Sequence, residues 1–256
     1  MSIKNLTNGA TDGVVKIGDT IRKPRGPWAS AVEALLCHLE KIQFPYAPRF
    51  LGIDEHNRQI LSYIAGTAGH YPAPPFAWSD ATLVKEAQML RLFHDSTASF
   101  DWNTYPIWQG SAVSVFAPEV ICHNDFATYN LIYEKDNPIA IIDFDTCSPG
   151  TRAWDIAYAA IRCLPLGTPE QQKNWGVQKP EHFARRLDLF LETYGIDDLS
   201  NIIHLMQERL TLIKSSTEKL ALGSGRNANR IRNEKHIESY QVTIAYFEQQ
   251  LRQQKY

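Results

Sequence analysis

The sequence predicts an α+β fold of two lobes, with a small antiparallel sheet and one helix over residues 1–66 and a larger, mainly helical lobe over residues 67–256. Short apolar runs punctuated by glycines fill the first region, as is typical of strands joined by turns. Apolar residues at helical spacing recur through most of the second region. With 256 residues the chain can bury a substantial core, either as one domain or as two lobes.

The first lobe is predicted to contain strands and one helix. The strands lie at residues 14–17, around Ile21 and at Gln59–Ile64. After Pro24 the apolar residues recur at the spacing of an amphipathic helix that packs on these strands. They are Val32, Leu35, Leu36, Leu39 and Ile42.

The second lobe begins with a proline-rich loop over Tyr71–Pro75 and continues with a helix that Ser79 and Asp80 can cap. One face of this helix carries Leu83, Ala87, Leu90 and His94. We expect His94 to be a core or hydrogen-bonded histidine rather than a ligand.

The C-terminal region contains three more predicted helices. The first has an apolar stripe that ends before Gly195, and the others run over residues 199–222 and about 234–254. The stripe consists of Phe183, Leu187, Phe190 and Tyr194.

A compound pattern after His123 contains the residue types that a phosphoryl-transfer site needs. Asp125 and Asn130 stand five residues apart, which is the spacing of the corresponding residues in a kinase catalytic loop. Residues 131–142 contain two short apolar runs around a polar turn, which predicts a hairpin. The hairpin would bring Asp143 back beside Asn130.

The chemistry of phosphoryl transfer explains these residue types. Negative charge spreads over the transferred group, so catalysis depends on positioning and on cations held by hard oxygen ligands, which Asn130 and Asp143 can supply. Asp125 can orient an acceptor hydroxyl and take its proton. Each residue alone would more often be a turn or cap residue. Their combination favours a site over an ordinary hairpin with polar ends.

The same segment resembles the aminoglycoside phosphotransferase superfamily of small-molecule kinases. In that family the catalytic loop reads His-Gly-Asp, and the metal-binding Asp opens an Ile-Asp-Trp or Ile-Asp-Phe segment. Residues 18–24, 26–28 and 48–54 further resemble a subgroup of short bacterial phosphotransferases, some of them grouped by similarity to trifolitoxin immunity proteins. The resemblance covers roughly residues 9–165 and implies a two-lobed protein-kinase-like fold that uses Mg²⁺ and ATP or GTP.

Carried over by position, the resemblance implies that Asp125 is the catalytic base and that Asn130 and Asp143 are the magnesium ligands. It implies that His123 braces the catalytic loop and that Asp155 is the helix carboxylate that ties this loop down.

Two positions depart from related patterns. Asn124 replaces the usual glycine between His123 and Asp125, and asparagine tolerates positive φ better than most residues. Asp145 stands where protein kinases have the glycine of Asp-Phe-Gly. It could be an additional metal or substrate carboxylate or, equally, a solvated loop residue.

Three residues of the first lobe are candidates for nucleotide binding. Lys23 would reach the α- and β-phosphates, with neighbouring Arg22 as its rival, because only one of two adjacent strand residues can enter the cleft. Glu33 could pair with this lysine, although the dipole of the helix also favours a glutamate in the first turn. Tyr63 lies in the predicted hinge, where adenine would bond to the backbone. The loop over residues 8–13 could cover phosphates or be a plain hairpin turn.

Composition and charge limit the classes of binding partner and the cellular compartment that we expect for this protein. A net charge of −2 argues against general nucleic-acid binding. The four cysteines show neither metal-site spacing nor a disulfide framework, which favours a reducing cytoplasm. The sequence starts without a signal-peptide pattern and contains no run of transmembrane length, so we expect no membrane association.

The expected function is therefore Mg²⁺-dependent transfer of the γ-phosphate of ATP or GTP to a hydroxyl of a small molecule. The alternative is a nucleotide-binding immunity or regulatory protein of the same fold without turnover. Residues 201–256 carry nine Lys/Arg against five Asp/Glu. We interpret these charges first as a solvated helix face. The region does not resemble the carboxylate-rich pocket that a polycationic aminoglycoside needs, and the sequence does not identify the acceptor.

Overall fold

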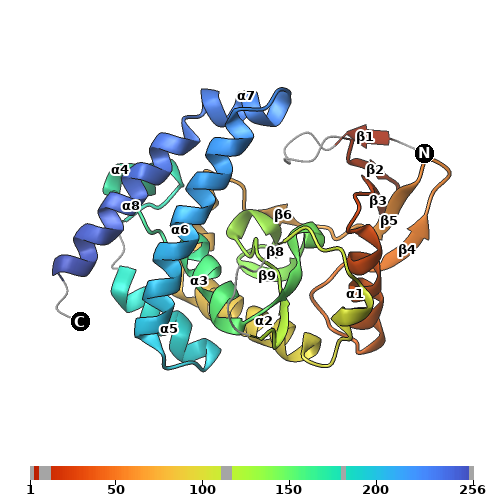
Figure 1. The fold of residues 1–256 in the computed structure, drawn as a ribbon, viewed down its shortest axis with the longest axis horizontal. Coiled ribbons are helices and arrows are strands. Elements are labelled where there is room, and N and C mark those ends of the chain that lie inside the picture. The colour runs from red at the N-terminus through yellow and green to blue at the C-terminus, as the bar shows by residue number, and fades with distance from the viewer. Residues whose placement is uncertain (1–2, 6–12, 111–116, 180–182, 254–256) are drawn as a thin grey trace.

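The computed structural model describes residues 3–5, 13–110, 117–179 and 183–253. A sheet of five strands with one helix lies at one end of the molecule, and a group of helices lies at the other (Figure 1). Two small sheets and the helices α2 (Asp80–Thr97) and α3 (Arg152–Cys163) lie between them. This is the predicted two-lobed α+β architecture, and the boundary after residue 66 remains a prediction.

The five-stranded sheet is antiparallel throughout, with the strand order β1-β2-β3-β5-β4. The helix α1 (Ala29–Lys41) follows the third strand and buries the predicted apolar face, except that Ile42 lies beyond its end and is 43% exposed. The strands are β1 (Ile3–Asn5), β2 (Val15–Ile17), β3 (Thr20–Pro24), β4 (Phe50–Ile53) and β5 (Arg58–Ser62). The predicted last strand thus ends two residues earlier than expected, because the chain leaves the sheet after Ser62.

The predicted hairpin is present as β8 (Leu131–Glu134) and β9 (Asn137–Ile141), with Leu131 opposite Ile141. Strand β6 (Thr67–Ala68) extends this hairpin to a three-stranded sheet. Strand β7 (Val120–Cys122) precedes the hairpin in the sequence, and strand β10 (Ser148–Gly150) follows it. These two strands pair with each other. The segment that contains the predicted catalytic residues is therefore framed by short strands at both of its ends.

Helices make up most of the remaining chain. Ser79 caps α2 by accepting a hydrogen bond from the Thr82 amide at 3.1 Å, as predicted. The other helices are α4 (Pro169–Asn174), α5 (Phe183–Tyr194), α6 (Leu199–Ala221), α7 (Arg226–Asn233) and α8 (His236–Gln253). Helix α7 was not predicted, because its sequence is almost entirely polar and gives no apolar periodicity.

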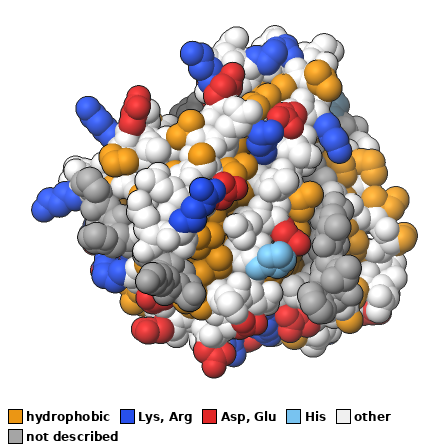
Figure 2. Space-filling view, turned by 60° about the vertical axis from the view of Figure 1, so that its left-hand side comes forward, with side chains coloured by type: hydrophobic (Ala, Val, Ile, Leu, Met, Phe, Trp, Pro, Cys, Tyr) orange, Lys and Arg blue, Asp and Glu red, His pale blue; other side chains and the backbone are white. Residues whose placement is uncertain are grey.

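A continuous hydrophobic core joins α1, the hairpin and the helices of the second region. None of the described helices has the length and apolar character needed to cross a bilayer. Figure 2 turns the helical end forward and shows hydrophobic side chains along the middle of this face, with many Lys and Arg side chains toward its edges.

One carboxyl group is fully enclosed by this core. Glu86 of α2 is 0% exposed, and its Oε1 accepts a hydrogen bond of 2.8 Å from Tyr133 Oη. Burial raises the pKa of Glu86 from its usual 4.5 to about 8. The folded protein therefore keeps this group protonated at a pH where the unfolded chain has ionised it.

Glu86→Gln is expected to raise the free energy of unfolding at alkaline pH relative to the wild type. Between pH 4.5 and about 8 the folded wild type binds more protons than the unfolded chain, so its stability falls as pH rises through this window. The glutamine variant lacks this loss, which amounts to roughly 2 to 4 kcal/mol. Denaturant unfolding at several pH values measures the difference, with the exposed Glu192→Gln as control. A difference that does not grow with pH would contradict the buried neutral carboxyl.

Candidate active site

The hairpin brings the predicted catalytic residues together. The amide of Ile142 donates to the Asn130 carbonyl at 2.9 Å, which places Asp143 next to Asn130 at the end of β9. On the other side, Asn130 Nδ2 donates to Asp125 Oδ2 at 2.8 Å and to its carbonyl oxygen at 2.9 Å. Asp125, Asn130 and Asp143 thus form one contiguous polar site.

Two tyrosines that the sequence reading missed hold Asp125. Tyr129 Oη and Tyr158 Oη donate to Asp125 Oδ1 at 2.7 and 2.5 Å, and the two phenol oxygens lie 3.2 Å apart. Tyr129 lies within the catalytic loop itself, whereas Tyr158 comes from α3. The carboxylate is therefore fixed from both sides, while the residue remains partly exposed.

The orientation of Asn130 suits a cation ligand. Its amide nitrogen is engaged by Asp125, so the amide oxygen is the atom left for another partner. In the described part of the chain, no group of three or more His, Cys, Asp or Glu could hold a metal by itself. Mg²⁺ typically takes one or two protein oxygens and completes its shell with water and phosphate oxygens. Asn130 and Asp143 fit that type of site.

Lys23 reaches this site from β3. Its Nζ contacts Asp143 Oδ1 and lies 3.0 Å from Asp145 Oδ2, and the residue is only 7% exposed. Burial alone would lower the pKa of Lys23, but the two carboxylates outweigh it and raise the pKa. Burial likewise opposes ionisation of Asp143, yet Lys23 keeps the pKa of that carboxyl below its usual value. For Asp145 burial dominates and raises the pKa.

The neighbouring Arg22 points elsewhere. Its Nη1 donates to Thr20 Oγ1 at 2.6 Å, and its Nε lies 3.6 Å from Asp54. Adjacent strand residues face opposite sides of a sheet, so the placement of Lys23 excludes Arg22 from the same cleft. Of the two residues that the sequence left open, the geometry favours Lys23.

Lys23→Ala is expected to raise the KM for nucleotide or lower kcat by at least about tenfold, because it removes a charged hydrogen-bond donor. Arg22→Ala should change either constant little. Steady-state kinetics of both variants, with nucleotide varied, measures the contrast. The reverse pattern would assign the phosphate contact to Arg22 and contradict the strand register.

Of the two interpretations that the sequence left open for Glu33, the pairing with Lys23 is not formed. Glu33 accepts hydrogen bonds from Arg25 Nε at 2.7 Å and Nη2 at 3.0 Å, and from Gln59 Nε2 at 3.2 Å. A bidentate guanidinium fits a carboxylate better than a single ammonium does, and the strand residue Lys23 is drawn to Asp143 instead. The helix dipole favours a glutamate in the first turn of a helix. Because α1 begins at Ala29, Glu33 lies beyond that turn.

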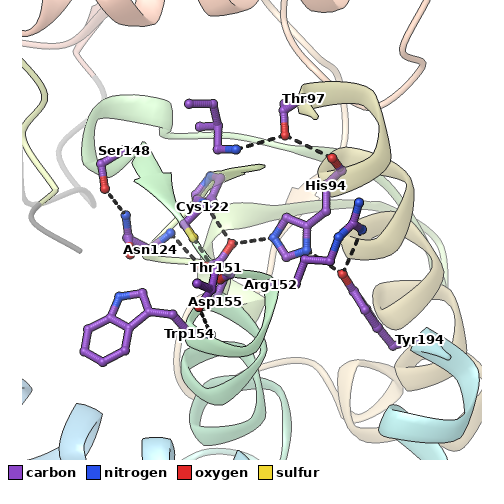
Figure 3. A network of polar contacts seen from close by, with 12 residues as sticks. His94, Thr97, Cys122, Asn124, Ser148, Thr151, Arg152, Trp154, Asp155 and Tyr194 are labelled. Atoms are coloured by element: carbon purple, nitrogen blue, oxygen red, sulfur yellow. Dashed lines mark hydrogen bonds and ion pairs between the residues drawn. The ribbon is translucent and has the colours of Figure 1, made fainter. Parts of the chain in front are cut away.

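A buried carboxylate anchors the loop that precedes Asp125, as the resemblance implied for Asp155. Asp155 of α3 accepts hydrogen bonds from the amides of His123 and Asn124 at 2.7 and 2.8 Å, and it pairs with His94 Nε2 at 3.0 Å (Figure 3). Burial would raise the pKa of Asp155, but these partners outweigh it and lower the pKa. The Nδ1 of His94 contacts Tyr194 Oη at 2.7 Å, so this histidine is a hydrogen-bonded core residue.

Two residues of the candidate site, Asn124 and Asp143, have a left-handed backbone conformation. Asn124 has φ of 63°, the conformation that asparagine tolerates, and its Nδ2 donates to Thr146 and Ser148. Asp143 also has positive φ, at 65°. His123 Nε2 donates to the Ile142 carbonyl at 3.1 Å and so braces the residue before Asp143. Asparagine and aspartate adopt left-handed backbone more readily than most other residues do.

The remaining candidates lie farther from this cluster. Tyr63 follows β5, donates its amide to the Asp19 carbonyl at 2.9 Å and lies under Lys16 Nζ, which is 3.3 Å from its ring centroid. Its role toward a nucleotide remains a prediction. Residues 8–12 of the possible phosphate loop lie outside the described residues. Burial raises the thiol pKa of Cys122 and Cys147, as expected of packing residues.

Two sequence comparisons find relatives of this chain. The profile of the phosphotransferase enzyme family matches residues 34–187. The trifolitoxin immunity protein of Rhizobium leguminosarum bv. trifolii is 30% identical over 202 residues, which cover 75% of this chain and 73% of that protein.

Solved structures share the fold at low sequence identity. An aminoglycoside 2′-phosphotransferase in complex with GDP has a TM-score of 0.60 and 12% identity, with 98% of this chain and 93% of that chain covered. An ethanolamine kinase of Plasmodium vivax has a TM-score of 0.59 and 15% identity, with 96% and 82% covered. These two similarities support the kinase-like fold.

Proposed function

This chain belongs to the phosphotransferase enzyme family, and from that premise we propose that it transfers the γ-phosphate of ATP or GTP to a hydroxyl group of a small molecule. The observation that carries the proposal is the contiguous arrangement of Asp125, Asn130, Asp143 and Lys23. These residues combine a base, two oxygen ligands and a cation, which are the parts that phosphoryl transfer uses.

Each residue has a role that follows from its contacts. Asp125 orients the acceptor hydroxyl and takes its proton, while Tyr129, Tyr158 and Asn130 hold its carboxylate in place. In the free protein Lys23 neutralises Asp143, and its ammonium group can bind a phosphate oxygen once a nucleotide enters.

Asn130 and Asp143 would hold Mg²⁺, which supplies positive charge to the phosphate oxygens when it is bound. The amide orientation of Asn130 and the ionised state favoured at Asp143 fit this role. Asp145, which shares Lys23 with Asp143, is a second carboxylate at the same place. We further propose that the protein acts in the cytoplasm.

The test uses purified protein with Mg-ATP or Mg-GTP and a panel of hydroxylated metabolites and antibiotics. Acceptor-dependent release of nucleoside diphosphate, together with a phosphorylated acceptor in the mass spectrum, is the expected result. Nucleotide binding without any acceptor-dependent turnover across the panel would count against the enzyme.

The second candidate is a nucleotide-binding immunity or regulatory protein without turnover. The observation that favours it is the 30% identity to a trifolitoxin immunity protein. Immunity through phosphorylation and immunity through binding predict different behaviour of Asp125 variants. That contrast separates the two candidates.

A further inference from the structure

A cavity of about 400 Å³ lies among the helices of the second lobe. Residues of α3, α4, α6 and α8 line it, together with the segment that precedes α2. Its volume is in the lower range of pockets that bind small organic ligands. The cavity can therefore hold the non-reacting part of a small acceptor.

Aromatic side chains form much of the cavity wall. The rings of Tyr71 and Trp78 are stacked, with centroids 6.2 Å apart and planes 5° from parallel. Trp175 packs against Tyr71 at 6.3 Å, and Tyr240 of α8 contributes a fourth ring. Such walls favour flat apolar groups, which stack against aromatic rings.

Arg162 of α3 gives this wall a positive charge. Its Nη2 donates to Tyr240 Oη at 2.8 Å, and its guanidinium lies 5.3 Å from the ring centroids of both Tyr158 and Tyr240. Among the residues that the structure describes, no carboxylate forms an ion pair with Arg162. The guanidinium has five N–H donors and is always charged, so it retains donors for an anionic ligand.

A second arginine, Arg209, stacks on the same tyrosine as Arg162 but does not line the cavity. The guanidinium of Arg209 lies 4.6 Å from the centroid of the same Tyr158 ring and donates to the Asn124 carbonyl at 3.1 Å. Arg209 is also without an ion pair in the described part of the chain, and burial lowers its pKa. Two guanidinium groups thus flank the ring of Tyr158, whose hydroxyl donates to Asp125, and neither forms an ion pair with a carboxylate of the described residues.

Negative charge is scarce around the cavity. Glu234 is the one acidic side chain among the described residues that line it. Its side chain is 56% exposed and already pairs with His236 Nε2 at 2.7 Å. Exposed ion pairs contribute little, and a second cation beside Arg162 would be repelled. A polycationic acceptor is therefore a poor fit for this cavity.

The cavity lies one layer of side chains away from the base. Tyr71 contacts the edge of Tyr129 at 5.8 Å, and Arg162 covers the ring of Tyr158. Both phenols donate to Asp125 Oδ1. To reach Oδ1, a hydroxyl group that extends from a ligand in the cavity has to displace one of these phenols, and it then takes the place of that phenol as the donor.

We propose that the acceptor is a hydroxylated compound with a flat apolar part and a carboxylate, which bind the aromatic wall and Arg162 respectively. This inference rests on the phosphotransferase function proposed above and specifies its substrate class. In the reaction the hydroxyl proton passes to Asp125 and the hydroxyl oxygen bonds to the γ-phosphorus. The bond from that phosphorus to the β–γ bridging oxygen breaks, and nucleoside diphosphate leaves.

The test compares two probes of matched size and opposite charge, para-hydroxymethylbenzoate and para-hydroxymethylbenzylamine, with kanamycin as a polycationic reference. Calorimetric titration into the full-length protein measures binding, and mass spectrometry after incubation with Mg-ATP or Mg-GTP measures phosphorylation. The benzoate is expected to bind at least about tenfold more tightly than the benzylamine, and to be the phosphorylated probe. Equal or tighter binding of the amine, or saturation by neither probe, overturns the proposal.

Arg162→Gln is expected to weaken benzoate binding by about tenfold and to leave benzylamine binding unchanged or tighter. The control is Arg252→Gln, which removes the same charge from an arginine that is 79% exposed and lies outside this cavity. Unchanged Mg-nucleotide affinity in both variants shows that the fold is intact. Undiminished benzoate binding in Arg162→Gln overturns the assignment of Arg162 as the carboxylate-binding residue. If that variant does not fold, the preference of the wild type for the benzoate over the benzylamine still tests the proposed substrate class.

The failure of this inference can be distinguished from failure of the proposed function. A wild-type protein that binds no Mg-nucleotide contradicts the phosphotransferase function itself. A protein that binds nucleotide but phosphorylates kanamycin or the benzylamine in preference contradicts the substrate class alone.

Discussion

Asp143→Asn is expected to abolish phosphoryl transfer and to weaken magnesium-dependent nucleotide binding by at least about tenfold. The substitution keeps the shape of the side chain and removes its charge, on which hard divalent cations depend. It also leaves Lys23 with Asp145 as its one remaining carboxylate partner within the described residues. Calorimetry with a non-hydrolysable ATP analogue, with and without magnesium, isolates the metal-dependent part of the affinity.

The matched control is Asp197→Asn, which neutralises an exposed aspartate before α6. This variant should bind the magnesium complex like the wild type. The magnesium-free affinity of Asp143→Asn should equal or exceed that of the wild type, because Lys23 is then less tightly held by carboxylates. An unchanged magnesium-dependent affinity in Asp143→Asn would remove this residue from the metal site.

The part of the site that lies on the hairpin was predictable from sequence, because its geometry is local. A turn and two short strands join Asp125 and Asn130 to Asp143. The register of this hairpin determines which residues of the two strands lie opposite each other. Positive φ at Asn124 followed from the residue type for the same reason.

Contacts between segments that are distant in the sequence were harder to predict. Tyr158 and Arg209 reach the site from α3 and α6, and neither contact has a local sequence signal. The spacing of Asp155, Tyr158 and Arg162 on one helical face could have indicated that α3 lines the site. The sequence left the pairing of Glu33 open, and it gave no sign that Arg25, on the loop before α1, is its partner.

The tyrosine pair sets a condition for catalysis. Asp125 Oδ1 already accepts two phenol hydrogen bonds, and Oδ2 accepts one from Asn130. An acceptor hydroxyl therefore competes with a phenol for the same oxygen, and substrate binding must reorganise this network. In the proposed reaction Asp125 would thereby be held in place before the acceptor arrives, and its orientation would not have to be found during the transfer.

Asp125→Asn is expected to cut the transfer rate by a factor on the order of 10² or more, while Mg-nucleotide binding stays near the wild-type value. The amide cannot take the proton of the acceptor hydroxyl. Its oxygen can still accept from Asn130 Nδ2, and its NH₂ group can donate to the phenol oxygens of Tyr129 and Tyr158. The hydrogen-bond network that positions Asn130 is thus satisfied in the variant, so the metal site should persist.

The decisive comparison measures nucleotide affinity and transfer rate in the same preparations of wild type and Asp125→Asn. A phosphotransferase predicts equal affinity and a large loss of rate, because the base acts on the acceptor and the nucleotide is bound by other residues. A binding-only protein predicts no acceptor-dependent turnover in the wild type and the same biological activity in the variant. Full transfer activity in Asp125→Asn would contradict its role as the base, whereas protection of cells by an inactive variant would favour the immunity protein.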